Sequence, residues 1–196
     1  MLDLEPAAVR LRALVPDATG RLTAPTPCAG TSVGDLLDHI MALALAFRYA
    51  ADKTDTEIVK RPPPEPSVSR LDPSWPSLLP ERLDALVAAW REPAAWEGTT
   101  WAGGQNFPAA EAGAVALDEL VLHGWDLAKA LGRGYQVDPA SAEAVHAFAS
   151  AVPDDPEARA GLFGPVVPVP ADAPLFDRAL GLAGRNPAWT PPDREG

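Results

Sequence analysis

The sequence predicts an all-α protein, built as a bundle of four main helices with one long crossover connection and short additional C-terminal helices. Apolar residues recur at three- and four-residue steps over several stretches of bundle length. No stretch shows the sustained alternation expected of a β-strand. A proline-rich segment separates the second and third helical stretches, as a long crossover requires.

Composition limits the possible classes of protein. The 196 residues are 47% hydrophobic, enough for the core of one domain spanning residues 1–196. A net charge of -11 argues against a nucleic-acid partner and against an anionic membrane surface. Cys28 is the single cysteine, and there is neither a signal-peptide pattern nor an apolar run long enough to span a bilayer. We therefore expect a cytoplasmic protein.

The first two helices have clear start signals. Residues 5–15 form the first, with a proline in its first turn, and Pro16 is expected to help end it. Residues 32–52 form the second, where Ser32 and Asp35 resemble a capping box. His39 lies on the flank of its apolar stripe, which consists of Leu36, Ile40, Leu43 and Phe47.

The remaining elements follow from proline, glycine and apolar spacing. Residues 60–80 contain too many prolines for a helix and predict an extended crossing segment. A third helix is expected over residues 80–92, an irregular segment with a possible hairpin over 93–110, and a fourth helix over 109–132. A fifth helix over 138–152, capped by Asp138, a loop over 164–174 and a short helix over 175–184 complete the chain.

The fourth helix is apolar nearly all round but carries a narrow polar strip. Glu119, His123 and Asp126 form the strip, and Gly124 lies within the broad apolar face, where it permits close helix packing. A helix of this kind is usually buried. Charged side chains are rarely buried unless they are paired or bind a metal ion, so the strip is expected to face something that compensates its charge.

The strip contains a possible metal site. Glu119 and His123 are four residues apart on one helix face, and His39 supplies a third ligand if the second and fourth helices are neighbours. Two histidines and a glutamate with an open fourth position are typical of catalytic zinc. The alternative is that His123 only hydrogen-bonds Glu119 in a solvated groove and that His39 is a satisfied boundary histidine. Spacing alone leaves both interpretations open.

Two motifs carry a resemblance to a known family. "TPCAGTSVGDLLDHI" and "LDELVLHGWDLAKALG" resemble the DinB-like, mycothiol-dependent maleylpyruvate isomerase N-terminal domain family of actinobacteria. The tail "GPVVPVPADAPLFDRALGLAGRNPAW" looks like a single-domain subgroup of metal-binding proteins. The resemblance implies a DinB-like four-helix bundle and a metal triad of His39, Glu119 and His123. It implies a divalent metal, zinc first and nickel or another ion as alternatives, with mycothiol as thiol cosubstrate.

Two departures from the family bear on activity. Thr31 stands where family members often carry an aromatic residue, and the isomerase has an extra C-terminal domain for which this chain has no room. This chain is therefore expected to share the fold and the metal site of the family, but not the isomerase reaction.

Three classes of function remain open. The first is a metal-dependent enzyme that uses mycothiol for S-transfer to, or isomerisation of, a small electrophile. The second is a non-catalytic metal-binding or ligand-sensing bundle, and the third a purely structural protein. Asp126 either orients His123 or a water, or forms a plain helix-face salt bridge. Cys28 is expected to pack rather than react. The sequence names no catalytic residue, no substrate and no oligomeric state.

Overall fold

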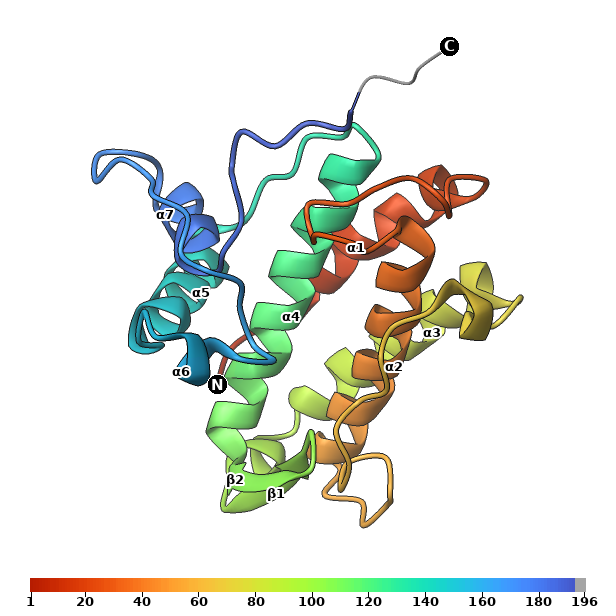
Figure 1. Cartoon of the computed structure of the whole chain (residues 1–196). Helices are drawn as coiled ribbons and strands as arrows, with labels where there is room; N and C mark the ends of the chain where they lie inside the picture. The colour runs from red at the N-terminus through yellow and green to blue at the C-terminus, as the bar shows by residue number, and fades with distance from the viewer. Residues whose placement is uncertain (193–196) are drawn as a thin grey trace.

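Four helices form the body of the computed structural model, which describes residues 1–192. They are α1 (Glu5–Ala18), α2 (Val33–Ala51), α3 (Trp75–Trp90) and α4 (Ala109–Ala130). Both α3 and α4 pack against α1 and against α2, which closes the bundle around one hydrophobic core (Figure 1). The predicted all-α bundle with a long connection between its second and third helices is confirmed.

The C-terminal helices cover the other side of α4 (Figure 1). α5 (Pro139–Ala151) packs against α4 and against α7 (Leu175–Leu182). The single-turn α6 (Pro156–Arg159) lies between α5 and α7 in the chain. The possible hairpin is present as β1 (Thr99–Ala102) paired antiparallel with β2 (Gln105–Pro108). Short 3₁₀ helices span Val68–Arg70 and Pro93–Trp96. No helix within residues 1–192 is long and apolar enough to cross a membrane.

The start of α2 is fixed by the predicted capping box. The Asp35 backbone N–H donates to Ser32 Oγ at 3.2 Å, and Asp35 Oδ2 accepts from the Ser32 backbone N–H at 3.0 Å. The crossing segment is fastened to the same helix, because Val68 N–H donates to Asp35 Oδ1 and Ser67 N–H donates to Asp38 Oδ2. These bonds hold the first two turns of α2, from which His39 projects.

Two helix boundaries differ from the prediction, and both involve proline. α1 continues through Pro16 to Ala18, since a proline in the last turn removes only one hydrogen bond while Val15 and Ala18 stay buried. α3 begins at Trp75 instead of residue 80. Pro76 lies in its first turn, where a missing N–H costs nothing, and the buried Trp75 anchors that turn.

Two glycines of α4 make room for aromatic side chains. A Cβ on Gly124 would lie 2.6 Å from the Tyr135 hydroxyl, so this glycine admits a loop tyrosine and not, as predicted, a neighbouring helix. A Cβ on Gly113 would lie 2.5 Å from the Trp96 ring and 2.8 Å from the Trp90 ring. Both indoles are held by hydrogen bonds to backbone carbonyls, so neither ring can move aside cheaply.

We expect Gly113→Ala to destabilise the protein. Overpacking costs about 1–3 kcal/mol, which outweighs the gain of about 1 kcal/mol in helix propensity. The free energy of unfolding, measured with urea, should therefore fall. Gly134→Ala is the matched control, because a Cβ there meets no atom within 4 Å. Equal stability of the two variants would contradict the packing argument.

Candidate metal centre

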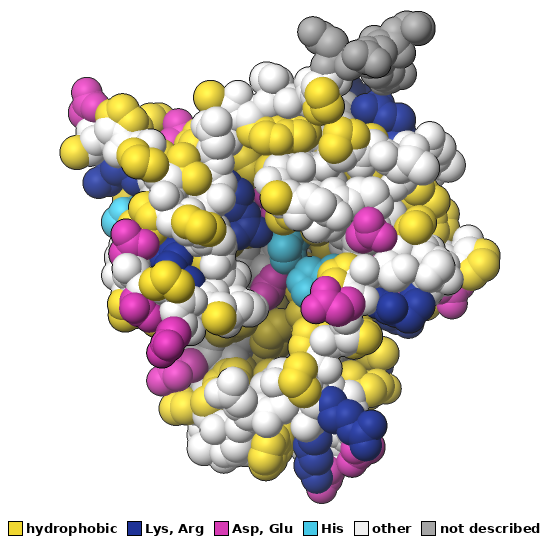
Figure 2. Space-filling view, in the orientation of Figure 1, with side chains coloured by type: hydrophobic (Ala, Val, Ile, Leu, Met, Phe, Trp, Pro, Cys, Tyr) yellow, Lys and Arg dark blue, Asp and Glu magenta, His cyan; other side chains and the backbone are white. Residues whose placement is uncertain are grey.

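The packing of α2 against α4 brings the three predicted ligands together. His39, Glu119 and His123 each offer a donor atom, and these atoms lie within 4.8 Å of one another. His123 Nε2 is 2.8 Å from Glu119 Oε2, and the two imidazole rings meet edge to face with centroids 5.0 Å apart. Figure 2 shows histidine side chains at the bottom of a hollow on this face of the molecule.

The second nitrogen of His123 is held from behind by a buried carboxylate. His123 Nδ1 lies 3.1 Å from Asp126 Oδ2, and Asp126 is fully buried. When Nδ1–H donates to this carboxylate, the lone pair of Nε2 points toward Glu119 and His39. A carboxylate that orients a ligating histidine in this way is the usual partner in metal sites. Of the two predicted roles for Asp126, the structure contains the geometry of both, since Asp126 contacts His123 and also forms a salt bridge, with Arg185.

Asp126 also receives hydrogen bonds from two distant parts of the chain. Cys28 Sγ donates to Asp126 Oδ2 at 3.1 Å, and Arg185 Nη2 donates to the same oxygen at 3.0 Å. Arg185 also donates through Nη1 to the Ala183 carbonyl at 2.9 Å. Burial raises the pKa of Asp126, but the charge of Arg185 and the bond from His123 outweigh it and lower the pKa to about 2. The carboxylate is therefore ionised and paired.

The triad is electrostatically coupled. Burial lowers the pKa of His123, but its bonds to Asp126, Cys28 and Glu119 outweigh burial and raise the pKa well above the ordinary value. Burial and the neighbouring His123 lower the pKa of His39. Burial raises the pKa of Glu119, but the hydrogen bond and charge of His123 bring it below the usual value. Without a metal ion, the positive charge of the triad therefore rests on His123.

Asp118 is a buried acid outside the predicted polar strip of α4. Only 3% of its surface is exposed, and its Oδ1 has no hydrogen-bond partner among the described residues. Burial and the adjacent Glu119 raise its pKa well above the ordinary value. It lines the same cavity as the triad, so the cavity floor contains an acidic group besides the candidate ligands.

The donor set of the triad fits a divalent metal ion. Ligand bonds of about 2.0–2.2 Å place neighbouring donors roughly 3–4 Å apart, close to the observed grouping. Cys28, His123 and Asp126 form a second group with donors within 4.8 Å, on the opposite ring nitrogen of His123. Arg185 already pairs with the carboxylate of Asp126 in that group, and its guanidinium would repel a metal cation there. The fit therefore favours His39, Glu119 and His123.

A cavity of about 500 Å³ opens onto the triad. The loop containing Cys28 forms one wall, and residues 161–165 and 183–185 form another. Arg159 holds the second wall in place, because its guanidinium donates to the carbonyls of Gly164 and Leu182. Cys28 therefore lines the site as well as packing against it. Arg48, Arg133 and Arg178, which could each have bound a substrate carboxylate, do not line this cavity.

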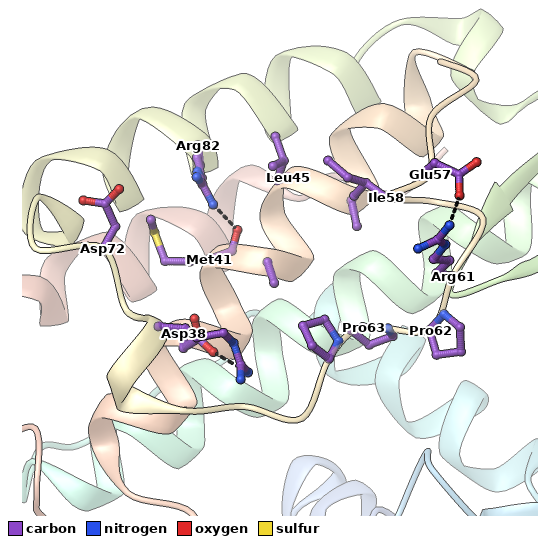
Figure 3. Close-up of a pocket in the computed structure, with 14 residues that line it drawn as sticks. Asp38, Met41, Leu45, Glu57, Ile58, Arg61, Pro62, Pro63, Asp72 and Arg82 are labelled. Atoms are coloured by element: carbon purple, nitrogen blue, oxygen red, sulfur yellow. Dashed lines mark hydrogen bonds and ion pairs between the residues drawn. The ribbon is translucent and has the colours of Figure 1, made fainter.

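A separate pocket of about 630 Å³ lies between α2, α3 and the crossing segment (Figure 3). Its charged residues are paired within the protein: Arg61 with Glu57 at 2.6 Å, and Arg82 with the Met41 carbonyl at 2.8 Å. It contains none of the three candidate ligands, and Pro63 forms part of the wall between the two cavities.

Comparison with known proteins agrees with the fold. The family model of the mycothiol maleylpyruvate isomerase N-terminal domain matches residues 4–128. The chain belongs to this family. Crystal structures of the mycothiol-dependent maleylpyruvate isomerase and of a histidine-to-alanine mutant of it share the fold, each with a TM-score of 0.53. They are 17% and 18% identical to this chain and cover 76% of it and 70% of their own chains. No curated protein matches significantly.

The family match ends inside α4. It includes His39, Glu119 and His123, but neither Arg185 nor the wall formed by residues 161–165. The cavity wall formed by residues 161–165 and 183–185 is therefore built by a segment that the family model does not describe.

Proposed function

We propose that this protein is a metal-dependent enzyme that uses a low-molecular-weight thiol, mycothiol, to act on a small electrophile. The observation that carries the proposal is that His39, Glu119 and His123 converge on an open cavity instead of a sealed core. Membership of a family named for mycothiol supports the choice of thiol.

The protein's own residues would hold and orient the metal. His39, Glu119 and His123 would be its ligands, with zinc the first candidate and nickel an alternative. A bound divalent metal lowers the pKa of a coordinated thiol and so supplies a thiolate at neutral pH. By accepting a hydrogen bond from His123 Nδ1–H, Asp126 would leave Nε2 as the nitrogen that binds the metal. Arg185 keeps Asp126 ionised.

Two reactions suit a thiolate beside an electrophile. In S-transfer, a C–S bond forms at the electrophilic carbon and the leaving group departs with the electron pair of the broken bond. In isomerisation, the thiolate adds to a conjugated cis double bond, the remaining single bond rotates, and expulsion of the thiolate restores a trans double bond. The alternative function is a non-catalytic metal-binding or ligand-sensing bundle, which would need no open cavity at the metal.

A cobalt-substituted sample separates the two functions. We expect millimolar mycothiol to add a sulfur charge-transfer band to the spectrum of the Co²⁺-loaded protein, because a thiolate would enter the open position. S-methyl mycothiol is the matched control, since it has the same sugar groups and no free thiol. If Co²⁺ binds stoichiometrically and mycothiol does not change the absorption spectrum, the thiol-enzyme proposal fails and the non-catalytic alternative replaces it.

A further inference from the structure

A second cavity adjoins the candidate metal centre directly. It measures about 740 Å³ and shares Leu43, Glu119, Gly161 and Leu162 with the cavity that contains the triad. We call it the apolar lobe. Its further apolar lining comes from α2, the hairpin, α4 and α5, through Phe47, Ala102, Phe107, Val115 and Phe148. Any group bound in this lobe would lie beside Glu119.

The charges around the lobe are all of one sign. The charged residues that line it are Glu111 and Glu119, and no Lys or Arg of residues 1–192 does so. In the adjoining cavity Arg185 is already bonded to Asp126 and to the Ala183 carbonyl. The charge of His123 is likewise already paired, with Glu119 and Asp126. A carboxylate bound here would lose its hydration without gaining a cationic partner, which is strongly unfavourable.

Aromatic side chains continue from one cavity into the other. Phe148 lines the apolar lobe, Phe163 lines the cavity of the triad, and their rings meet edge to face at 6.0 Å. Leu162 lines both cavities and is 38% exposed. Apolar cavities with a few polar groups at one end are typical small-molecule sites.

We infer that the apolar lobe binds the electrophile, and that this electrophile is an uncharged aryl or alkyl compound and not a dicarboxylate. The inference rests on the proposed function for the position of the thiol. A substrate carboxylate could satisfy its charge on the metal only by taking the position that the thiol needs. The family name refers to an acidic substrate, and the lining of this lobe does not suit one.

Binding without turnover tests the inference independently of the thiol chemistry. Dinitrobenzene and dinitrobenzoate lack a leaving group and differ by one carboxylate. Their dissociation constants can be compared without thiol on protein freed of metal by a chelator, so that no open metal position can bind the carboxylate. We expect dinitrobenzene to bind at least roughly tenfold more tightly. Equal affinities, or preference for the benzoate, would overturn the inference whether or not the protein is an enzyme.

Matched variants locate the binding site. Leu162→Arg places a cation at the apolar lobe, and Ile58→Arg makes the same change in the separate pocket of Figure 3; both side chains are exposed enough to be replaced without unfolding. Leu162→Arg should weaken dinitrobenzene binding and strengthen dinitrobenzoate binding, while Ile58→Arg should change neither. The reverse result would assign the ligand to the other pocket and overturn the inference.

Turnover provides the second test. With mycothiol, a chlorodinitrobenzene and a chlorodinitrobenzoate both form a C–S bond as the C–Cl bond breaks and chloride leaves with the electron pair; the thiol proton goes to solvent. Each rate is divided by the rate without protein. A larger acceleration for the uncharged compound supports the inference, and a larger one for the benzoate overturns it. No acceleration of either compound, with the binding preference intact, would count against the proposed function and leave the inference supported.

Discussion

Replacing His123 with Ala is expected to abolish stoichiometric binding of a divalent metal ion while the helical circular-dichroism signal persists. The variant removes the nitrogen that lies 2.8 Å from Glu119, and two remaining ligands hold a metal far more weakly than three. The fold should survive, because the core is apolar and Asp126 keeps its ion pair with Arg185. Metal analysis of the purified variant, together with its spectrum, measures both effects.

The chain contains a matched control for this prediction. His146 lies on α5, where it contacts Ser150, and it belongs to neither group of potential metal ligands. His146→Ala should therefore keep its metal, while His39→Ala should lose it as His123→Ala does. Unchanged metal in the His123 variant would show that the ligands are wrongly assigned. Global unfolding of that variant would point instead to a structural metal.

Local patterns in the sequence were sufficient for most of the fold. Apolar periodicity placed the four main helices, and the side chains of Ser32 and Asp138 cap helices as predicted. The errors arose where burial outweighs the local signal. Pro16 was expected to help end a helix, yet the packing of its neighbours carries that helix one turn further. The single turn of α6 is too short to produce a periodic pattern.

The candidate site was predictable only where its residues share a helix. The four-residue spacing of Glu119 and His123 predicts that they share a helix face. The position of His39 beside an apolar stripe predicts that it lies near them. Asp126 meets Cys28 and Arg185 across 98 and 59 residues of sequence, and no local pattern encodes such contacts. Asp118 could have been noticed as an acidic residue of this helix outside the polar strip. The composition of the apolar lobe depends on five separate segments, so it required the structure.

Replacing Arg185 with Met is expected to destabilise the protein strongly. Arg185 is 10% exposed and pairs with the fully buried Asp126 at 3.0 Å, so the variant leaves a buried carboxylate without its cation. Breaking a buried pair from one side costs about 3–5 kcal/mol, part of which His123 can offset through its own bond to Asp126. Urea unfolding measures the loss. The pKa of Asp126 should rise as well, because the charge of Arg185 is the largest factor that lowers it.

An arginine-to-methionine substitution at an exposed ion pair shows how much of the stability loss depends on burial of the pair. Arg133 makes two hydrogen bonds to Asp17, at 2.8 and 2.9 Å, but both side chains are solvent-exposed, so Arg133→Met should cost much less than Arg185→Met. Adding Asp126→Asn to Arg185→Met removes the uncompensated charge and should recover part of the lost stability. If the double variant is no more stable than Arg185→Met, the guanidinium stabilises the fold by fastening residues 183–185 to α4, and the charge of Asp126 is not what it compensates.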